Sequence, residues 1–374
     1  MAEQSFFGSS LPSPVPRNMS LTPLESVSLP IDLSDFDEVI DVRTPQEFAE
    51  DHLPGARNLP VLTNEQRVEV GTLYKESAFK GRRLGAGHVS QAIANYLSGP
   101  LRNTDPKWAP LIYCWRGGQR SSAVATILRS VGWRARTLEG GYKAYRRFVM
   151  DDLVSRLAHP SLELRVIGGL TGVGKTLLLA ALEEAGQQTI DLEKMANHRG
   201  SLLGSVGPQP TQRRFETCLH SQLASMDPDR PIYLEAESNR IGSVYLPPAL
   251  WQRLARSNVI ELTLPIRERV LLLLESYRHF LETPESLSEV IEPLGRIRGR
   301  AQLQIWQEQI ARRAWPDFVT SLLENHYDLC YRQPGSANSN YQPPASQLAL
   351  SDHSTTSYRN AACTLSKAEE FPAP

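Results

Sequence analysis

One segment constrains the fold of this chain more than any other. Residues Gly169–Thr176 read GLTGVGKT and satisfy the pattern G-x-x-x-x-G-K-[ST]. An apolar run, Leu164–Ile167, precedes the segment, and a helical pattern from Lys175 to about Ala185 follows it. A strand, a glycine-rich turn and a helix in this order predict a phosphate-binding loop (P-loop) within a parallel α/β domain. We therefore expect a diphosphate site formed by Gly169, Gly172, Gly174, Lys175 and Thr176, with Thr176 able to reach Mg²⁺.

A second strand-to-helix turn carries a cysteine. Cys114 follows the apolar strand Leu111–Tyr113 and precedes the helical segment Ser121–Val131. Backbone N–H groups of such a turn and nearby guanidinium groups stabilise a thiolate, which is the nucleophilic form of cysteine. We expect Cys114 to be catalytic and an anion to be held by Arg116, Gly117, Gly118 and Arg120. An inert buried cysteine is the alternative, but it gives no reason for the arginines and glycines that follow it.

The 374 residues are too many for one ordinary core, and strands alternate with helices in two stretches. Residues 31–157 contain strands at Glu38–Val42, Leu111–Tyr113 and Arg136–Leu138, with a helix at Pro45–Glu50. Residues 160–333 contain the P-loop and a helical end. In this second stretch we expect strands ending at Asp191, at Ile232–Glu235 and at Asn258–Leu264, followed by helices in Ile266–Leu281 and Arg296–Leu323. The predicted class is α/β, with two domains.

Residues 1–30 and 334–374 are rich in Ser, Pro, Gln, Asn and Ala, and this composition predicts disordered tails. The start has neither a basic leader nor an apolar core, so we expect no secretory signal and a cytoplasmic protein. The longest apolar run, Leu177–Leu182, is far too short for a membrane span. The four cysteines lie far apart, which argues against a structural metal.

Charge does not by itself indicate a nucleic-acid partner, because 40 Lys+Arg against 41 Asp+Glu leave a net charge of −1. A local basic cluster would have to make any RNA contact, and Arg296, Arg298 and Arg300 are our candidates. Such arginines are as often solvated surface. Asp191 and Glu235 close strands of the second stretch and could orient a metal or a base, although strand-end carboxylates also serve as helix caps.

The first stretch resembles a rhodanese domain over its whole length. The resemblance rests on the Cys114 loop and on three further segments, namely Asp41–Phe48 (DVRTPQEF), His52–Pro60 (HLPGARNLP) and Leu138–Tyr142 (LEGGY). Rhodaneses carry a chalcogen on the loop cysteine. Their usual loop is C-x4-R, whereas this one is C-x5-R from Cys114 to Arg120. Our hypothesis is that the longer loop accommodates a bulkier anion such as selenophosphate.

A rhodanese domain followed by a P-loop domain resembles one family, tRNA 2-selenouridine synthase, over residues 31–333. The segments that carry this resemblance are Val70–Lys75, Arg116–Ser121, Asp191–Glu193, His198–Ser201, Glu237–Ser238 and Ile241–Gly242. Several of them belong neither to generic rhodaneses nor to generic P-loop kinases. The resemblance implies a selenotransferase that acts on 2-thiouridine at the wobble position (position 34) of tRNA.

The resemblance also implies a reaction sequence and partners. Geranyl diphosphate first alkylates the sulfur, and the S-geranyl group then leaves as selenium enters from selenophosphate. Cys114 would carry selenium as an S-selanylcysteine, and we infer that the P-loop would hold the departing diphosphate with Mg²⁺. No tightly bound cofactor is implied. The implied partners are Lys, Glu and Gln tRNAs and selenophosphate synthetase, with the protein acting as a monomer.

Other functions fit part of the pattern. A rhodanese-type tRNA sulfurtransferase coupled to a P-loop ATPase would consume ATP during turnover. A regulatory protein that senses anions and nucleotides would need no catalytic cysteine. A phosphatase would explain the C-x5-R loop but has no use for the P-loop.

Overall fold

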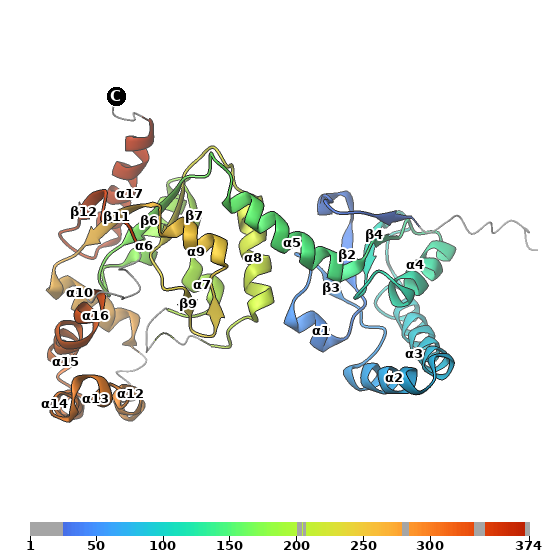
Figure 1. Ribbon diagram of the computed structural model, residues 1–374, viewed down its shortest axis with the longest axis horizontal. Helices are drawn as coiled ribbons and strands as arrows, with labels where there is room; N and C mark the ends of the chain where they lie inside the picture. The colour runs from blue at the N-terminus through green and yellow to red at the C-terminus, as the bar shows by residue number, and fades with distance from the viewer. Residues whose placement is uncertain (1–24, 200–203, 205–206, 279–283, 333–340, 371–374) are drawn as a thin grey trace, which may run out of the picture. The chain divides into compact units, whose positions relative to one another are not determined.

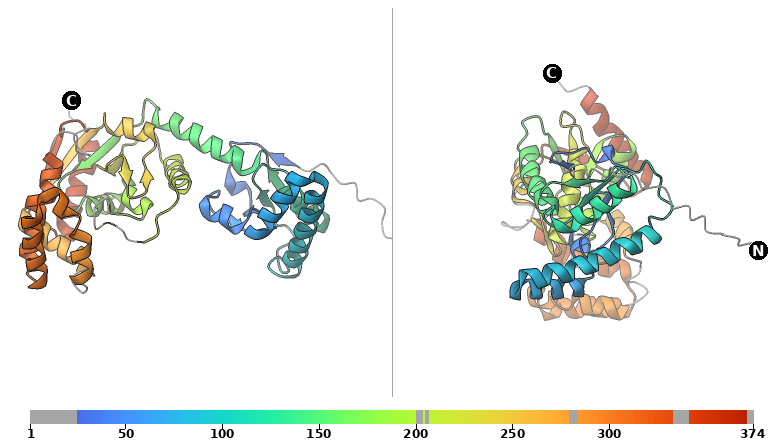
Figure 2. Two further views of the ribbon diagram at one scale, coloured as in Figure 1. Left: turned by 60° about the horizontal axis from the view of Figure 1, so that its bottom comes forward. Right: turned by 90° about the vertical axis from the view of Figure 1, so that its right-hand side faces the viewer.

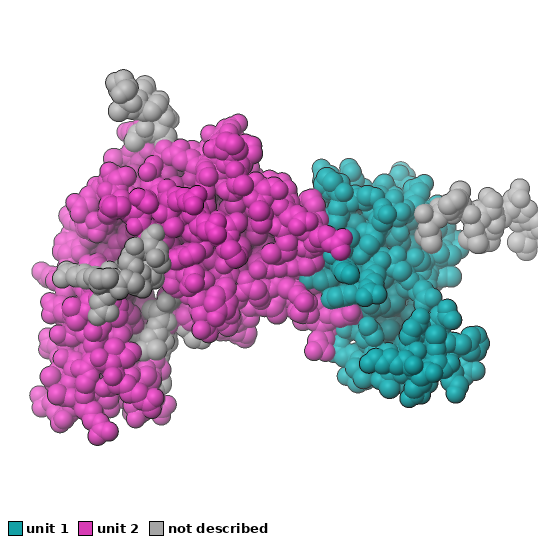
Figure 3. Space-filling view, viewed as in Figure 1, with its two compact units in different colours: residues 1–45, 55–144 teal, residues 46–54, 145–374 magenta. Residues whose placement is uncertain are grey.

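The computed structural model describes residues 25–199, 204, 207–278, 284–332 and 341–370. The chain divides into two compact units, which Figure 3 shows in different colours. Unit 1 comprises residues 1–45 and 55–144, and unit 2 comprises residues 46–54 and 145–374. The division falls inside helix α5 (Gly141–Leu157), whereas we predicted the first domain to end with that helix.

Unit 1 is built on a parallel sheet of five strands in the order β1-β5-β4-β2-β3. The strands are β1 (Ser26–Val27), β2 (Glu38–Asp41), β3 (Arg57–Asn58), β4 (Pro110–Tyr113) and β5 (Arg136–Leu138). The central strand β4 is buried along its whole length, which explains its continuous apolar sequence. Helix α4 (Gln119–Val131) packs on this strand and carries the cysteine loop at its start. The predicted α/β class is confirmed.

Two helices of unit 1 lie outside the sheet and were not predicted. Helix α2 (Asn64–Glu76) begins at a capping box, in which the Thr63 hydroxyl accepts from the Gln66 amide and the Gln66 side chain accepts from the Thr63 amide. Helix α3 (Ala78–Ser98) runs beside it, as Figure 2 shows. No residue of α2 is buried, so its sequence lacks the apolar stripe that identifies most helices.

Unit 2 contains a second parallel sheet of five strands, in the order β12-β11-β6-β8-β7 (Figure 1). Its strands are β6 (Leu164–Gly168), β7 (Gln188–Ile190), β8 (Ile232–Glu235), β11 (Asn258–Thr263) and β12 (Ser346–Ala349). The P-loop follows the central strand β6, and helix α6 (Lys175–Glu184) begins directly after it. The loop therefore lies at the carboxyl edge of the sheet, where parallel α/β sheets bind ligands.

Short elements complete the two units. An antiparallel hairpin pairs β9 (Arg240–Ile241) with β10 (Val244–Tyr245). The remaining elements are η1 (Leu33–Asp35), α1 (Pro45–Glu50), α7 (Leu192–Ala196), α8 (Gln212–Ala224), α9 (Pro248–Leu254), α10 (Ile266–Ser276), α12 (Pro284–Ile291), α13 (Leu294–Arg298), α14 (Arg300–Ala311), α15 (Trp315–Leu322), η2 (Leu323–Tyr327) and α16 (Asp328–Arg332). The helical character predicted for the end of this domain is confirmed over the described residues. None of the helices described here is both long enough and apolar enough to cross a bilayer.

The C-terminal segment is the main correction to our predictions. Residues 334–374 were expected to form a disordered tail, but β12 pairs with β11, and helix α17 (Thr355–Glu370) packs against α6. Tyr358 is buried on α17, and its hydroxyl donates a hydrogen bond to the Val173 carbonyl in the P-loop, at 2.9 Å. Polar composition misled the prediction because the few apolar residues of this segment, among them Leu350 and Tyr358, pack into the core beside an existing sheet.

The N-terminal tail, predicted over residues 1–30, needs a smaller correction. Residues 26 and 27 form β1 and pair with Thr137 and Leu138 of β5. A strand of two residues is too short to show a periodic pattern. The rest of the predicted tails at residues 1–24, 334–340 and 371–374, the last residue of the predicted P-loop domain at 333, the family segment at residues 200 and 201, and the predicted helix end at residues 279–281 lie outside the described residues.

Replacing Tyr358 tests whether the C-terminal segment belongs to the folded unit. We expect Tyr358→Ala to lower the free energy of unfolding of unit 2 by about 3 kcal/mol, because it removes a buried aromatic ring. Thr364→Ala, on an exposed position of the same helix, is the control and should be near neutral. Urea unfolding of the full chain measures both changes. Equal, small effects would mean that the segment adds nothing to the fold.

Candidate active site

Cys114 lies between the end of β4 and the start of α4. It is buried, and its sulfur makes two hydrogen bonds. The Ser121 hydroxyl donates to Sγ at 3.2 Å, and the thiol lies 3.8 Å from the Gly118 carbonyl that it can donate to. Gly118 caps α4 without a side-chain hydrogen bond, so the amides of the first turn remain available to an anion.

The surroundings of Cys114 favour its thiolate. Burial alone would raise the pKa of the thiol, and it is the largest single influence. The hydroxyl and amide of Ser121, the charge of Arg120 and the amide of Arg116 act in the opposite direction, and together they lower the pKa below its ordinary value of 9.0. Sequence reasoning identified the two arginines but missed Ser121, which lies one helical turn after Gly118.

The start of α5 holds the cysteine loop from behind. The Tyr142 amide donates to the Cys114 carbonyl at 2.8 Å, and the Lys143 amide donates to the Trp115 carbonyl at 2.9 Å. This contact requires a residue without a side chain at position 141, because a Cβ on Gly141 would lie 2.3 Å from the Cys114 carbonyl oxygen. The two glycines of the LEGGY segment thus let two backbone segments touch.

A buried ion pair supports the same contact. Asp41 ends β2, and its carboxylate accepts hydrogen bonds from the Arg43 amide at 2.8 Å and from the Arg43 guanidinium at 2.6 Å. Both side chains are fully buried. The guanidinium carbon lies 3.9 Å from the centre of the Tyr142 ring, a cation–π contact. The DVR segment therefore positions the aromatic residue whose amide binds the cysteine loop.

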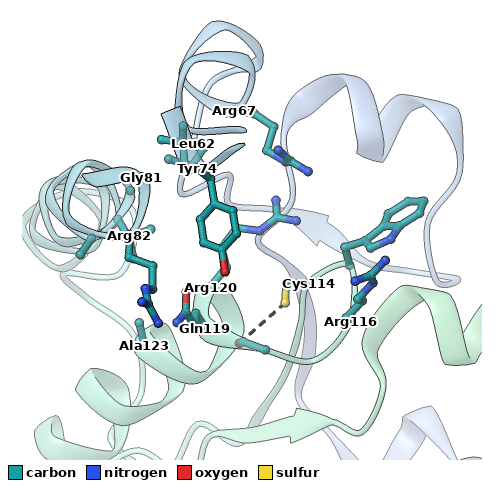
Figure 4. A pocket seen from close by; sticks show the side chains of 16 residues that line it. Leu62, Arg67, Tyr74, Gly81, Arg82, Cys114, Arg116, Gln119, Arg120 and Ala123 are labelled. Atoms are coloured by element: carbon teal, nitrogen blue, oxygen red, sulfur yellow. Dashed lines mark hydrogen bonds between the residues drawn. The ribbon is translucent and has the colours of Figure 1, made fainter. Parts of the chain in front are cut away.

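A pocket of about 600 Å³ opens above Cys114. Arg116, Gly118, Gln119 and Arg120 line it at the cysteine loop, and helices α2 and α3 form the opposite wall. In Figure 4 the side chains of Tyr74, Gln119 and Arg120 gather around the space above the sulfur. The predicted anion-loop residues Arg116, Gly118 and Arg120 are thus brought together at the pocket, whereas Gly117 faces the rear of the loop, where a Cβ on it would lie 2.6 Å from the Leu138 carbonyl oxygen.

The P-loop has the backbone that its sequence predicts. Gly169, Gly172 and Gly174 all have positive φ angles. The Lys175 ammonium donates to the Gly169 carbonyl at 3.4 Å, so it lies across the mouth of the loop. Arg269, a buried residue of α10, donates to the Thr171 carbonyl at 2.8 Å and holds the loop from outside. This arrangement presents amides and an ammonium group to a diphosphate.

Carboxylates crowd one side of the P-loop. Glu235 is fully buried and accepts from the Thr176 hydroxyl at 3.3 Å and from the Glu193 amide at 3.2 Å. Burial raises the pKa of both Glu235 and Glu193 above the ordinary value. The charges of Asp191 and Glu237 add to the shift of Glu235, and those of Glu235 and Glu237 add to the shift of Glu193. Asp191 also caps α7, because its side chain accepts from the Lys194 amide at 2.7 Å.

Sequence reasoning found Asp191 and Glu235 but missed Glu193 and Glu237. The signal was available, since both missed residues lie two positions after a strand-end carboxylate.

The donor set at the P-loop fits Mg²⁺. Within the described residues, no three acidic, histidine or cysteine side chains come together as a metal shell. A P-loop magnesium needs only the loop hydroxyl and one carboxylate, because phosphate oxygens and waters supply the other ligands. Thr176 and Glu235 provide that pair. A divalent cation would also offset the neighbouring negative charges that, after burial, raise the pKa of Glu235.

The three predicted RNA-contact arginines of α13 and α14 (Arg296, Arg298 and Arg300) differ in their surroundings. Arg298 is part-buried, and its guanidinium donates to His326 Nδ1 at 3.2 Å and to the His326 carbonyl at 3.1 Å. These hydrogen bonds tie Arg298 to the neighbouring helical segment, so its guanidinium has a structural role. Arg296 and Arg300 are exposed.

Comparisons with known proteins agree with the two-part organisation. A family model described as the tRNA 2-selenouridine synthase AAA domain matches residues 162–313, and a rhodanese-like domain model matches residues 25–148. A tRNA 2-selenouridine synthase from Nitrosomonas europaea is 36% identical over 269 residues, which cover 68% of each chain. The synthase from Hydrogenovibrio crunogenus is 33% identical over 320 residues, covering 78% of this chain and 88% of the relative. The synthase from Marinobacter nauticus is 37% identical over 244 residues, covering 64% and 65%.

Ser121→Ala tests the origin of the cysteine's acidity. Because the variant loses a donor to the thiolate, we expect the pKa of Cys114 to rise and its alkylation by iodoacetamide to begin at higher pH. Mass spectrometry of the Cys114 peptide separates this thiol from the other three. Ser122→Ala, at the next position, should leave the profile unchanged. Identical shifts in both variants would contradict the assigned role of Ser121.

Proposed function

Because the chain belongs to the tRNA 2-selenouridine synthase family, we propose that it replaces the sulfur of wobble 2-thiouridine in tRNA by selenium, through an S-geranyl intermediate. The observation that carries the proposal is the Cys114 thiol of lowered pKa, at the base of a pocket that also contains Arg116 and Arg120. A small inorganic selenium donor needs such a site, since its negative charge must be held near the nucleophile. We propose selenophosphate as that donor.

The first step uses the P-loop. The sulfur of the thiouridine attacks the geranyl C1, the carbon–oxygen bond to the diphosphate breaks, and N3 of the base loses a proton. The loop amides and Lys175 would neutralise the charge that builds on the leaving diphosphate. Mg²⁺, held by Thr176 and Glu235, would supply further positive charge when bound. The positions of Lys175 and Thr176 at the loop support this role.

The second step uses Cys114. The thiocarbonyl sulfur of 2-thiouridine is a poor leaving group. Once it carries the geranyl group, it can leave C2 of the base as geranyl thiolate. The Cys114 thiolate first attacks the selenium of selenophosphate, the phosphorus–selenium bond breaks with its electron pair staying on phosphorus, and phosphite leaves, so that Cys114 carries an S-selanyl group. The terminal selenium then forms its bond to C2 of the base as the geranyl thiolate leaves. A small thiol attacks the Cys114 sulfur, the sulfur–selenium bond breaks to release 2-selenouridine, and a second thiol reduces the resulting mixed disulfide on Cys114. Arg116, Arg120 and the α4 amides would hold the selenophosphate that loads the cysteine. An anticodon loop can present its wobble base unstacked to such a pocket. Arg296 and Arg300, both exposed, are our candidates for contact with the tRNA backbone.

Two variants separate the steps. The full-length protein is incubated with an anticodon stem-loop RNA containing 2-thiouridine, geranyl diphosphate, selenophosphate and Mg²⁺, and nucleosides are identified by mass spectrometry. In Cys114→Ser we expect S-geranyl-2-thiouridine to accumulate without selenouridine. In Lys175→Ala we expect geranylation to fall by about 10²-fold, with 2-thiouridine left unchanged.

Cys363→Ser, at an exposed cysteine, is the control and should behave as wild type. Selenouridine formation by Cys114→Ser would contradict the proposal. ATP consumption coupled to the insertion of sulfur, without a geranylated nucleoside, would favour a sulfurtransferase instead.

A further inference from the structure

The pocket above Cys114 is larger and more apolar than a selenium donor requires. At about 600 Å³ it has the volume of roughly twenty water molecules. Its polar groups lie at the cysteine loop and on Arg67, Tyr74 and Arg82 of the helix pair. The remaining wall consists mainly of Leu62, Val70, Ala86, Val89 and Ala123, from the segment before α2 and from α2, α3 and α4. A small, strongly hydrated anion gains nothing from such a wall.

Helices α2 and α3 form the apolar side as a unit. They approach closely at Gly81, where a Cβ would lie 2.6 Å from the Tyr74 Cα atom. At the mouth of the pocket, Tyr74 is half-exposed, and Arg67 and Arg82 are exposed. The pocket thus combines apolar walls with arginines on two sides, Arg67 and Arg82 on the helix pair and Arg116 and Arg120 at the cysteine loop (Figure 4).

We propose that this pocket binds the prenyl chain of the S-prenylated wobble uridine and so places C2 of the base beside Cys114. The inference rests on the proposed function, because it takes the prenylated nucleoside from it. A small polar site for the anion would suffice for selenophosphate alone. A ten-carbon prenyl chain instead needs apolar walls, because its binding is driven by removing the chain from water. Arg67 and Arg82 at the mouth suit the phosphates flanking the base. The chain thereby serves as a handle that distinguishes the intermediate from unmodified thiouridine.

Filling the pocket tests this assignment. Ala86 lies on the exposed side of α3 and lines the pocket, so Ala86→Phe places a ring in the space without disturbing the core. Ala94→Phe, two turns further along α3 on an exposed position outside the pocket lining, is the matched control. The probes are two anticodon stem-loop RNAs that carry S-geranyl-2-thiouridine or S-methyl-2-thiouridine at the wobble position. Dissociation constants are measured with the full-length protein.

We expect the wild type and Ala94→Phe to bind the geranyl RNA at least about tenfold more tightly than the methyl RNA, the effect of burying roughly two methylene groups. Ala86→Phe should abolish this preference and leave the affinity for the methyl RNA unchanged. Val70→Thr, which places a hydroxyl in the wall, should reduce the preference partially.

Failure of the inference and failure of the proposed function are distinguishable. Equal affinities of the wild type for both RNAs would overturn the prenyl subsite, even if selenouridine still forms. An equal loss of affinity for both RNAs in Ala86→Phe would show that the pocket holds the base or the RNA backbone rather than the prenyl chain. A preserved preference for the geranyl RNA without any selenouridine formation would uphold the subsite and contradict the proposed function.

Discussion

The chemistry of unit 1 depends on a backbone contact between the cysteine loop and the first turn of α5. The Tyr142 amide donates a hydrogen bond to the Cys114 carbonyl, and the Lys143 amide donates one to the Trp115 carbonyl. The loop is therefore held from behind, while the amides of Arg116 and Ser121 act on the sulfur. The buried pair of Asp41 and Arg43 stabilises this arrangement through the Tyr142 ring. These hydrogen-bond donors offset the effect of burial, which by itself would raise the pKa of the thiol.

The site of unit 2 differs from that of unit 1 because it combines a cationic loop with nearby carboxylates. Its P-loop offers amides and Lys175 to an anion, but carboxylates lie close by, and burial together with their charges raises the pKa of Glu193 and Glu235. A site with this composition is prepared for a diphosphate together with a divalent cation, since either alone leaves charge uncompensated. Residues far from the loop in sequence hold it in place, namely Arg269 at Thr171 and Tyr358 at Val173.

The sequence predicted what local patterns encode and missed what depends on tertiary partners. Strands β4, β5 and β8 and both glycine loops were found because apolar runs and turn residues are local signals. Helix α2 was missed because it buries no residue, and α17 was missed because its composition is polar. The roles of Glu193 and Tyr358 arise from neighbours distant in the chain, whereas Ser121 acts on Cys114 within the same loop. The pocket itself could not be predicted, since its apolar wall comes from the helix pair that was missed.

The central claim is that the close approach of α5 to the cysteine loop lowers the pKa of Cys114. The most direct test is the pKa of this thiol in Gly141→Ala, measured from ultraviolet absorbance of the thiolate with Cys114→Ser as the blank. The added methyl group cannot fit 2.3 Å from the Cys114 carbonyl, so the loop must shift and lose donors to the sulfur. We predict that the pKa rises toward the ordinary value of 9.0. An unchanged pKa in a folded Gly141→Ala protein would contradict the claim.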